Sequence, residues 1–183
     1  FGKTERSDFV AIAVWVAYRG IAYLVDERRA KMDFHEALAH LRDLARKYPQ
    51  CGRWQVEGGT MGNGRSIITS AREPDETGFS VAGLVEVRYE KGDDKTTRAT
   101  SISPIARMER CRVPSAVQAA WVDAWVEEHV SFPNEPDDRV DCTSMTLDYL
   151  RRFMFRGGDY EQPIHEEWAP DEPIVPGGMP DTF

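Results

Sequence analysis

The sequence predicts a mixed α/β domain in which α-helices flank a β-sheet, and three observations point to this fold class. Residues 9–18 form a continuous apolar run rich in β-branched and aromatic side chains, which favours a strand covered on both faces. Residues 34–45 repeat apolar side chains at helical spacing, behind Asp33 and Glu36 in a capping-box arrangement. Beyond them, helix and strand patterns alternate along the chain, which is typical of a mixed sheet with helices packed on it.

Local signals set the order of the elements. Arg19-Gly20 predicts a tight turn, so the strand over 9–18 should form a hairpin with a second strand over 21–26. Pro49 ends the first helix. The remaining pattern predicts strands over 54–57 and 81–89 and helices over 64–72, 95–109, 116–129 and 138–153.

Composition fits an intracellular protein with one core-forming domain. The chain has 183 residues, of which 41% are hydrophobic, enough for a proper core. No stretch is apolar for long enough to span a membrane, and the first residues lack the pattern of a secretion signal. Cys51, Cys111 and Cys142 are scattered, which favours buried small side chains in a reducing compartment over disulfides.

Acidic charge gathers at the C-terminal end. The net charge is −8, and residues 154–183 hold seven acids against one base, so the preceding part is nearly neutral. The overall charge therefore neither favours nor excludes DNA as a partner. The same end is rich in Pro and Gly, so we expect a folded domain over 1–153 and an extended acidic tail over 154–183. The tail is either a solvating end or a peptide that docks on a partner through Ile164 and Trp168.

Two carboxylates mark the start of the helix predicted over 138–153. Asp138 and Asp141 are three residues apart in its first turn, so their side chains can face the same point. Hard divalent cations prefer several oxygen ligands, which makes this turn a candidate metal site. The alternative is that acids in a first turn cap free N–H groups and complement the helix dipole. We expect the side chains of Glu135 and Asp137 to cap the helix or to face solvent.

A third carboxylate, that of Glu57, is expected at the edge of the sheet. Glu57 ends a predicted strand and precedes Gly58-Gly59, where loops leave space around the side chain. The alternative is an ordinary exposed glutamate at a strand end. The four histidines show no ligand spacing with cysteine or glutamate, so we do not expect a zinc site.

Five segments, in the same order along the chain, resemble motifs of one known family. They are residues 4–14 (TERSDFVAIAV), residues 23–44 (YLVDERRAKMDFHEALAHLRDL), Val56-Glu57 with Gly62-Asn63-Gly64, Lys95 and Arg98 with the later Pro104 and Arg112-Val113-Pro114, and Phe132-Pro133-Asn134 with the run from Asp137 to Asp141 (DDRVD). The family is the nuclease domain of the large terminase subunit of tailed bacteriophages. The resemblance implies a ribonuclease H-like fold.

The resemblance also implies an activity. It indicates a metal-dependent endonuclease that cuts concatemeric double-stranded DNA during genome packaging, with two Mg²⁺ or Mn²⁺ ions in its site. It implies roles for seven side chains: Glu57, Asp138 and Asp141 as catalytic metal ligands, Asp8 as a supporting neighbour, and Arg65, Lys95 and Arg98 as contacts to DNA phosphates.

The family setting implies partners and a place of action. The partners are double-stranded DNA, an upstream ATPase domain of the same protein, the phage portal and the small terminase subunit, with no membrane involved. The place is the cytoplasm of the infected bacterial host, where the packaging motor works, rather than the mature virion.

Two departures from the family pattern bear on activity. The family's first strand, which lies centrally in the sheet and ends in the first metal-binding Asp, has no counterpart here, and Gly58 replaces a second Asp. Strands on either side of the missing one would expose unpaired backbone groups, so we expect another segment to fill the gap, or order only within a larger assembly. The alternative function is therefore a catalytically incomplete module that clamps DNA or docks on the portal. A junction resolvase would fit the acids but not the Phe-Pro-Asn and Lys-x-x-Arg context.

Overall fold

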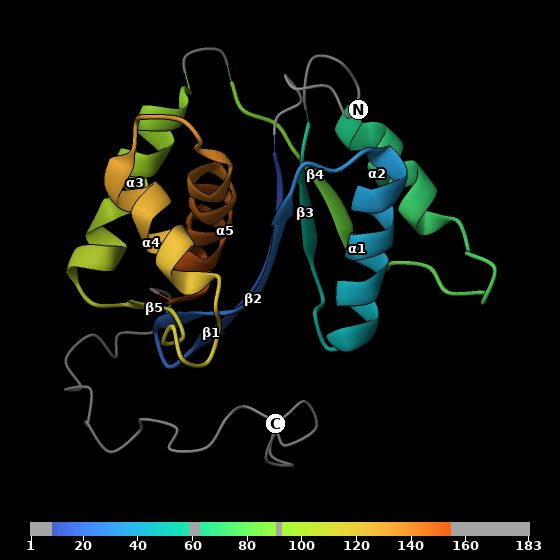
Figure 1. Ribbon diagram of the computed structural model, residues 1–183, viewed down its shortest axis with the longest axis horizontal. Helices are drawn as coiled ribbons and strands as arrows, with labels where there is room; N and C mark the ends of the chain where they lie inside the picture. Colours follow the sequence, from blue (N-terminus) through green and yellow to red (C-terminus); the bar gives the residue numbers. More distant parts are fainter. Residues whose placement is uncertain (1–8, 59–62, 91–92, 155–183) are drawn as a thin grey trace.

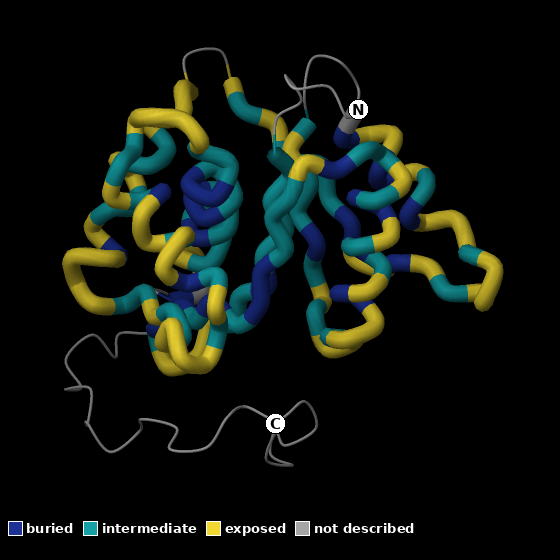
Figure 2. Tube along the Cα trace, viewed as in Figure 1, coloured by how far each residue is buried: buried dark blue, intermediate teal, exposed yellow. Residues whose placement is uncertain are grey.

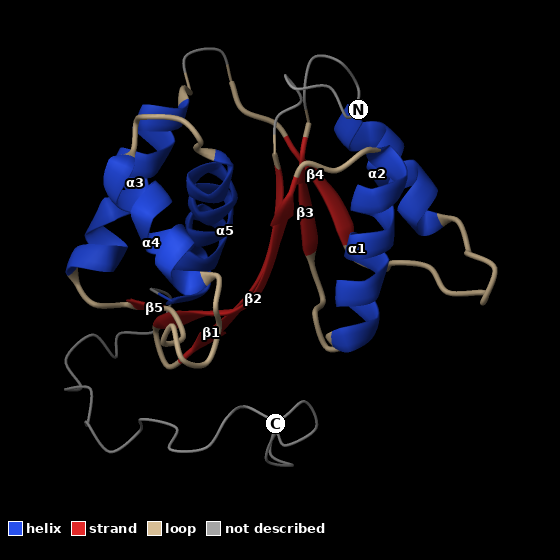
Figure 3. Cartoon of the chain, in the orientation of Figure 1, coloured by secondary structure: helices blue, strands red, loops and turns tan. Residues whose placement is uncertain are grey.

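The computed structural model describes residues 9–58, 63–90 and 93–154, and its strands form a middle layer between two groups of helices (Figure 1; Figure 3). Helices α3, α4 and α5 lie on one side of the strands, and α1 and α2 on the other. The elements in chain order are β1 (Val10–Tyr18), β2 (Ile21–Ala30), α1 (Phe34–Lys47), β3 (Trp54–Glu57), α2 (Asn63–Arg72), β4 (Leu84–Val87), α3 (Lys95–Arg107), β5 (Cys111–Arg112), α4 (Val122–Ser131) and α5 (Asp138–Met154).

The strands form two separate sheets. The first has the order β1-β2-β5, in which β1 and β2 make the predicted antiparallel hairpin and β5 runs parallel to β2. Arg19 and Gly20 form the hairpin turn with φ angles of 49° and 74°, values that a two-residue turn of this hand requires. The second sheet pairs β3 with β4 in parallel, from Trp54 opposite Leu84 to Glu57 opposite Val87.

The predicted first helix holds the larger core together. Asp33 and Glu36 form the capping box at the start of α1, each side chain accepting a hydrogen bond from the other's backbone N–H at 2.9 Å. The apolar face of α1, including Leu41 and Leu44, packs against Trp54 and other side chains of the second sheet and α2. A smaller cluster of Ala22, Ile105, Leu147 and Met154 joins α3 and α5 to the first sheet. Figure 2 shows the buried positions along the strands and on the helix faces turned toward them.

Strand β2 is longer than predicted because its charged residues are paired on both faces. The prediction ended the strand at Asp26, but β2 continues to Ala30. Successive strand side chains point to opposite faces. Asp26 accordingly accepts hydrogen bonds from Lys47 and Tyr48 of the α1 end, at 2.7 and 2.9 Å, whereas Glu27 pairs with Arg139 of α5 at 2.6 Å. A run of charges that would otherwise favour solvent is therefore neutralised inside the fold.

Other boundaries also differ from the prediction, most of all the starts of α4 and β4. Helix α4 begins at Val122 rather than at residue 116, because the Gln118 side chain accepts hydrogen bonds from the N–H and hydroxyl of Ser115 and holds that stretch in a turn. Strand β4 begins only at Leu84, since Gly83 turns the backbone with a φ of 69° just before it.

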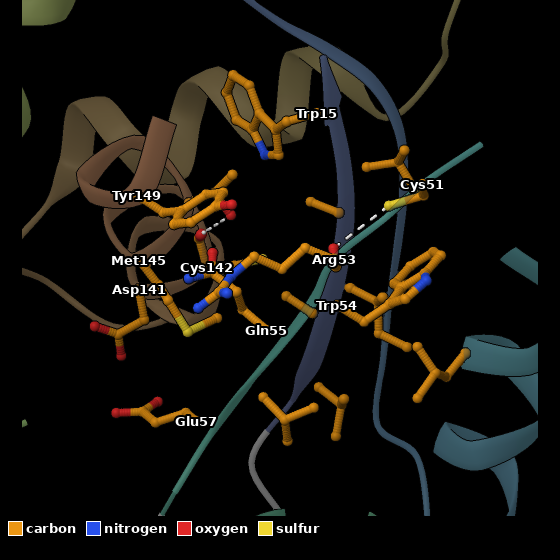
Figure 4. A pocket seen from close by; sticks show the side chains of 18 of the residues that line it. Trp15, Cys51, Arg53, Trp54, Gln55, Glu57, Asp141, Cys142, Met145 and Tyr149 are labelled. Atoms are coloured by element: carbon orange, nitrogen blue, oxygen red, sulfur yellow. Dashed lines mark hydrogen bonds between the residues drawn. The ribbon is translucent and has the colours of Figure 1, made fainter. Parts of the chain in front are cut away.

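The edges of the two sheets face each other across an open cavity. Strand β1 is an edge of the first sheet and β3 of the second, and within the described ranges neither edge pairs with a further strand. The cavity between them measures about 960 Å³ and is lined by residues 9–16, residues 50–57 and one face of α5. Arg53, which directly precedes β3, extends toward α5 and stacks on the ring of Tyr149 at 4.3 Å (Figure 4). The cavity thus lies where the family resemblance predicts the central strand of the sheet.

Two predictions concern residues that are not described. Asp8 lies outside the described residues, as does the predicted tail from residue 155 onward. Among the helices that are described, none is both long enough and apolar enough to cross a membrane.

Candidate active site

The predicted carboxylates are presented by the end of β3 and the beginning of α5. Strand β3 ends at Glu57, where the Gly58 N–H donates to the carbonyl of Val87 at 2.7 Å. Helix α2 starts close beside this strand end, and a side chain at Gly64 would clash with the backbone oxygen of Glu57. The glycine thus lets the first turn of α2 pack against the residue that carries the carboxylate.

Buried hydrogen bonds fix the first turn of α5. The Asp141 N–H donates to the carbonyl of Asp137 at 3.0 Å, and the Arg139 N–H donates to the carboxylate of Glu128 on α4 at 2.7 Å. Glu128 therefore satisfies one of the free N–H groups at the helix start, a task often done by the preceding residue. Asp138 and Asp141 consequently sit on a turn with a defined orientation.

Glu57 and Asp141 meet at one guanidinium group. The Nη2 atom of Arg98 lies 2.7 Å from Oδ1 of Asp141 and 3.7 Å from Oε1 of Glu57. Figure 4 shows the two acidic side chains at the same end of the cavity. Arg98 is itself held in place, because it stacks on the ring of Tyr89 at 3.9 Å and donates to the carbonyl of Asp93 at 3.2 Å.

Lys95 adds a second cation to the same carboxylates. Its Nζ atom lies 2.7 Å from Oδ1 of Asp137 and 2.7 Å from Oδ2 of Asp141. Both oxygens of Asp141 are thus in contact with a basic side chain. The sequence assigned Asp137 to capping or solvent, whereas its carboxylate belongs to this charged cluster.

Asp138 faces a different partner. Its Oδ2 atom lies 3.6 Å from Nη2 of Arg29, although the residue lines the same cavity as Glu57 and Asp141. Of the three predicted ligands, Glu57 and Asp141 are therefore brought together, and Asp138 lies beside them. In the part of the chain that the structure describes, no three Asp, Glu, His or Cys side chains are grouped closely enough to hold a metal ion.

Two carboxylates of the site, those of Glu57 and Asp138, have raised pKa values. Burial, and then the negative charge of Asp141, raises the pKa of Glu57, while Arg98 partly opposes this. Burial also raises the pKa of Asp138, with Arg29 acting in the other direction. Burial alone would lower the pKa of Lys95, but Asp137 and Asp141 outweigh it and raise that pKa. A cation near these oxygens relieves their repulsion, and basic side chains do so here.

The donor set suits a hard divalent cation. Its ligand atoms are carboxylate oxygens, the type that Mg²⁺ and Mn²⁺ prefer, and they converge at the rim of a cavity. The positive groups of Lys95 and Arg98 lie against the Asp141 oxygens and neutralise their charge. Glu57 and Asp141 are the side chains that would hold such an ion.

Arg65, the third predicted phosphate contact, lies apart from this cluster. It is exposed in the first turn of α2. Arg88 and, more weakly, Arg65 lower the pKa of Glu86 on β4, which places the Arg65 charge near that strand. Arg65 is therefore accessible to a ligand, whereas Arg98 is largely buried.

A buried ionic network supports the site from behind. Arg139 contacts Glu27 at 2.6 Å and Glu128 at 3.3 Å, and Arg29 contacts Glu128 at 3.3 Å. Glu27, Glu128 and Arg139 are all buried. The network joins β2, α4 and α5 and reaches Asp138 through Arg29. No sequence signal identified Arg29, because its partner is distant in the chain.

The mixed sheets flanked by helices are consistent with a ribonuclease H-like fold (Figure 1). A family model described as the terminase RNaseH-like domain matches residues 1–150. The chain belongs to this family, a phage terminase nuclease family, which confirms both the motif resemblance and the predicted mixed α/β fold. A search of curated proteins found no match.

Proposed function

We propose that this chain is the DNA-cutting domain of a phage packaging terminase, a divalent-metal-dependent endonuclease acting on concatemeric double-stranded DNA. One observation carries the proposal. Glu57 and Asp141 come from elements more than eighty residues apart in the sequence, yet both carboxylates contact the same Arg98 nitrogen at the rim of a cavity. Membership of the terminase RNaseH-like family supports a hydrolytic reaction on nucleic acid.

The proposed cofactor is Mg²⁺ or Mn²⁺. Glu57 and Asp141 would bind it directly, and Asp138, which lines the same cavity, is the third proposed ligand. When bound, such ions supply an activated water and stabilise the leaving oxygen of the phosphodiester. The fixed first turn of α5 would orient the carboxylates of Asp138 and Asp141 toward the ions.

Basic side chains around the acids are the proposed DNA contacts. Arg65 on α2 and Lys95 at the start of α3 are accessible from solvent, and Arg98 lies between the two elements that carry the carboxylates. Contacts of this kind hold phosphates without reading bases, so we expect cleavage with little sequence preference. Binding should weaken steeply as salt is raised.

One observation favours a second function. Within the described ranges the acids do not form a group of three that could hold a metal ion. The cavity between β1 and β3 leaves room for a further strand that could bring another acid, and no described strand occupies it. The alternative is a module that clamps DNA or docks on the portal without cutting. In either case the proposed partners are DNA, an upstream ATPase domain, the portal and the small terminase subunit. The proposed place of action is the cytoplasm of the infected host.

Nicking of supercoiled plasmid in Mn²⁺ separates the two functions. The test compares this chain with a version extended upstream by one strand that ends in an aspartate. We expect the extended version to nick the plasmid, because the added strand can pair with both β1 and β3 and present its acid beside Glu57. Chelation of the metal with EDTA should abolish the reaction. The enzyme proposal is lost if neither protein cuts, and retention of DNA binding by both would then favour the clamp.

A further inference from the structure

The two basic side chains of the acidic site are held very differently. Arg98 has an exposed side-chain fraction of 11% and is anchored by Tyr89, by the Asp93 carbonyl and by Asp141. Lys95 has an exposed fraction of 49% and makes charge-assisted hydrogen bonds to Asp137 and Asp141. The guanidinium is therefore a fixed part of the site, while the ammonium sits on a flexible stem with a path to solvent.

The contacts of Lys95 compete with two proposed roles, metal binding by Asp141 and phosphate binding by Lys95 itself. A divalent cation bound by Asp141 competes with Lys95 for the Oδ2 atom of that carboxylate. Asp137 and Asp141 engage two of the three N–H donors of the Lys95 ammonium and neutralise its charge, which leaves little attraction for a DNA phosphate. Both roles are fulfilled best when the ammonium leaves the carboxylates as the metal arrives, because the metal then takes over the neutralisation of Asp141.

We propose that Lys95 is an exchangeable counter-ion of the active site. In the metal-free chain it neutralises Asp137 and Asp141; a divalent cation held by Asp141 and Glu57 displaces it, and the freed ammonium then contacts a DNA phosphate. Metal binding and DNA binding are thereby coupled through one side chain, and by linkage each strengthens the other by the same factor. This inference rests on the proposed metal site.

The first test is calorimetric titration of the full chain with Mn²⁺. The Lys95→Met variant keeps the length of the side chain but removes the competing charge, so its Mn²⁺ affinity should rise roughly threefold to tenfold. The Lys95→Arg variant retains a cation and should stay near the wild-type affinity. Arg107→Met is the matched control, because Arg107 is exposed on the same helix roughly 18 Å along its axis. Asp141→Asn gives the background from other acids.

The second test separates displacement of Lys95 from a simple change of charge. Binding of a short fluorescent DNA duplex is measured by anisotropy with and without Ca²⁺ at constant ionic strength. Ca²⁺ should raise the DNA affinity of the wild type more than that of Lys95→Met, because only the wild type gains a freed phosphate contact. Electrostatic attraction alone would give the same enhancement in both proteins.

Two results would overturn the inference: unchanged or weaker Mn²⁺ affinity in Lys95→Met, or equal Ca²⁺ enhancement in the two proteins. Absence of Mn²⁺ binding above the Asp141→Asn background would overturn the metal site as well. Failure of the counter-ion role alone is recognised by a wild type that binds Mn²⁺ and supports nicking in the extended version. A circular-dichroism melt of each variant confirms that the fold is retained.

Discussion

Replacement of Asp141 by asparagine is expected to lower the rate of Mn²⁺-dependent plasmid nicking by the extended version at least about 100-fold. Asparagine keeps the shape of the side chain but removes the negative charge that a divalent cation needs. Asp141 is also the carboxylate on which Lys95 and Arg98 converge, so its loss removes one ion pair from each of these basic groups. Initial rates of supercoiled plasmid loss at saturating Mn²⁺ measure the effect.

Asp148→Asn is the matched control for this prediction. Asp148 lies two turns further along α5 and pairs with Arg151 on the surface at 2.6 Å, so the same charge change there should leave the nicking rate nearly unchanged. Equal rates for Asp141→Asn and Asp148→Asn would remove Asp141 from the list of ligands. A reduced rate accompanied by a lost circular-dichroism signal would indicate unfolding, and the wild-type thermal transition is therefore required of both variants.

Removal of the Glu128 carboxylate is expected to cause the largest loss of stability. Glu128 is buried, contacts Arg29 and Arg139 at 3.3 Å, and accepts the N–H hydrogen bond at the start of α5. Glu128→Ala leaves two guanidinium groups in the interior with too few partners. Breaking a buried ion pair from one side costs about 3–5 kcal/mol of unfolding free energy. Urea denaturation of the wild type and the variant measures the difference.

The neighbouring Glu127 provides the comparison. It is exposed on α4, so Glu127→Ala should change the unfolding free energy by no more than about 0.5 kcal/mol. Similar midpoints for Glu128→Ala and Glu127→Ala would mean that the buried network contributes nothing to the fold. Since Arg29 also contacts Asp138, loss of Glu128 is expected to disturb the site as well as the core.

Local sequence signals predicted the elements whose causes are local. The apolar run of β1, the turn at Arg19-Gly20 and the capping box of α1 each depend on residues close together in the chain, and the structure confirms all three. Strand β3 was predicted with its observed bounds, Trp54–Glu57, which placed Glu57 correctly at a strand end. The first turn of α5 was likewise predicted at Asp138.

Features that depend on distant partners were not predictable. The charged end of β2 was taken for the end of the strand, because nothing nearby indicates that Glu27 pairs with Arg139, more than a hundred residues away. For the same reason the sequence did not indicate that Asp137 forms an ion pair with Lys95, because that contact depends on how α3 packs against α5. Proximity of Glu57 to Asp141 came from the family resemblance and is consistent with the structure, but their joint role as metal ligands stays a prediction.

The most direct measurement of that role is the location of Mn²⁺ in crystals of the protein by anomalous scattering. The account predicts an anomalous peak within about 2.5 Å of carboxylate oxygens of both Glu57 and Asp141, with the Lys95 ammonium moved off Asp141. A Mn²⁺ peak at other acids of the surface, with Glu57 and Asp141 still bridged by Arg98 and Lys95 alone, would contradict it.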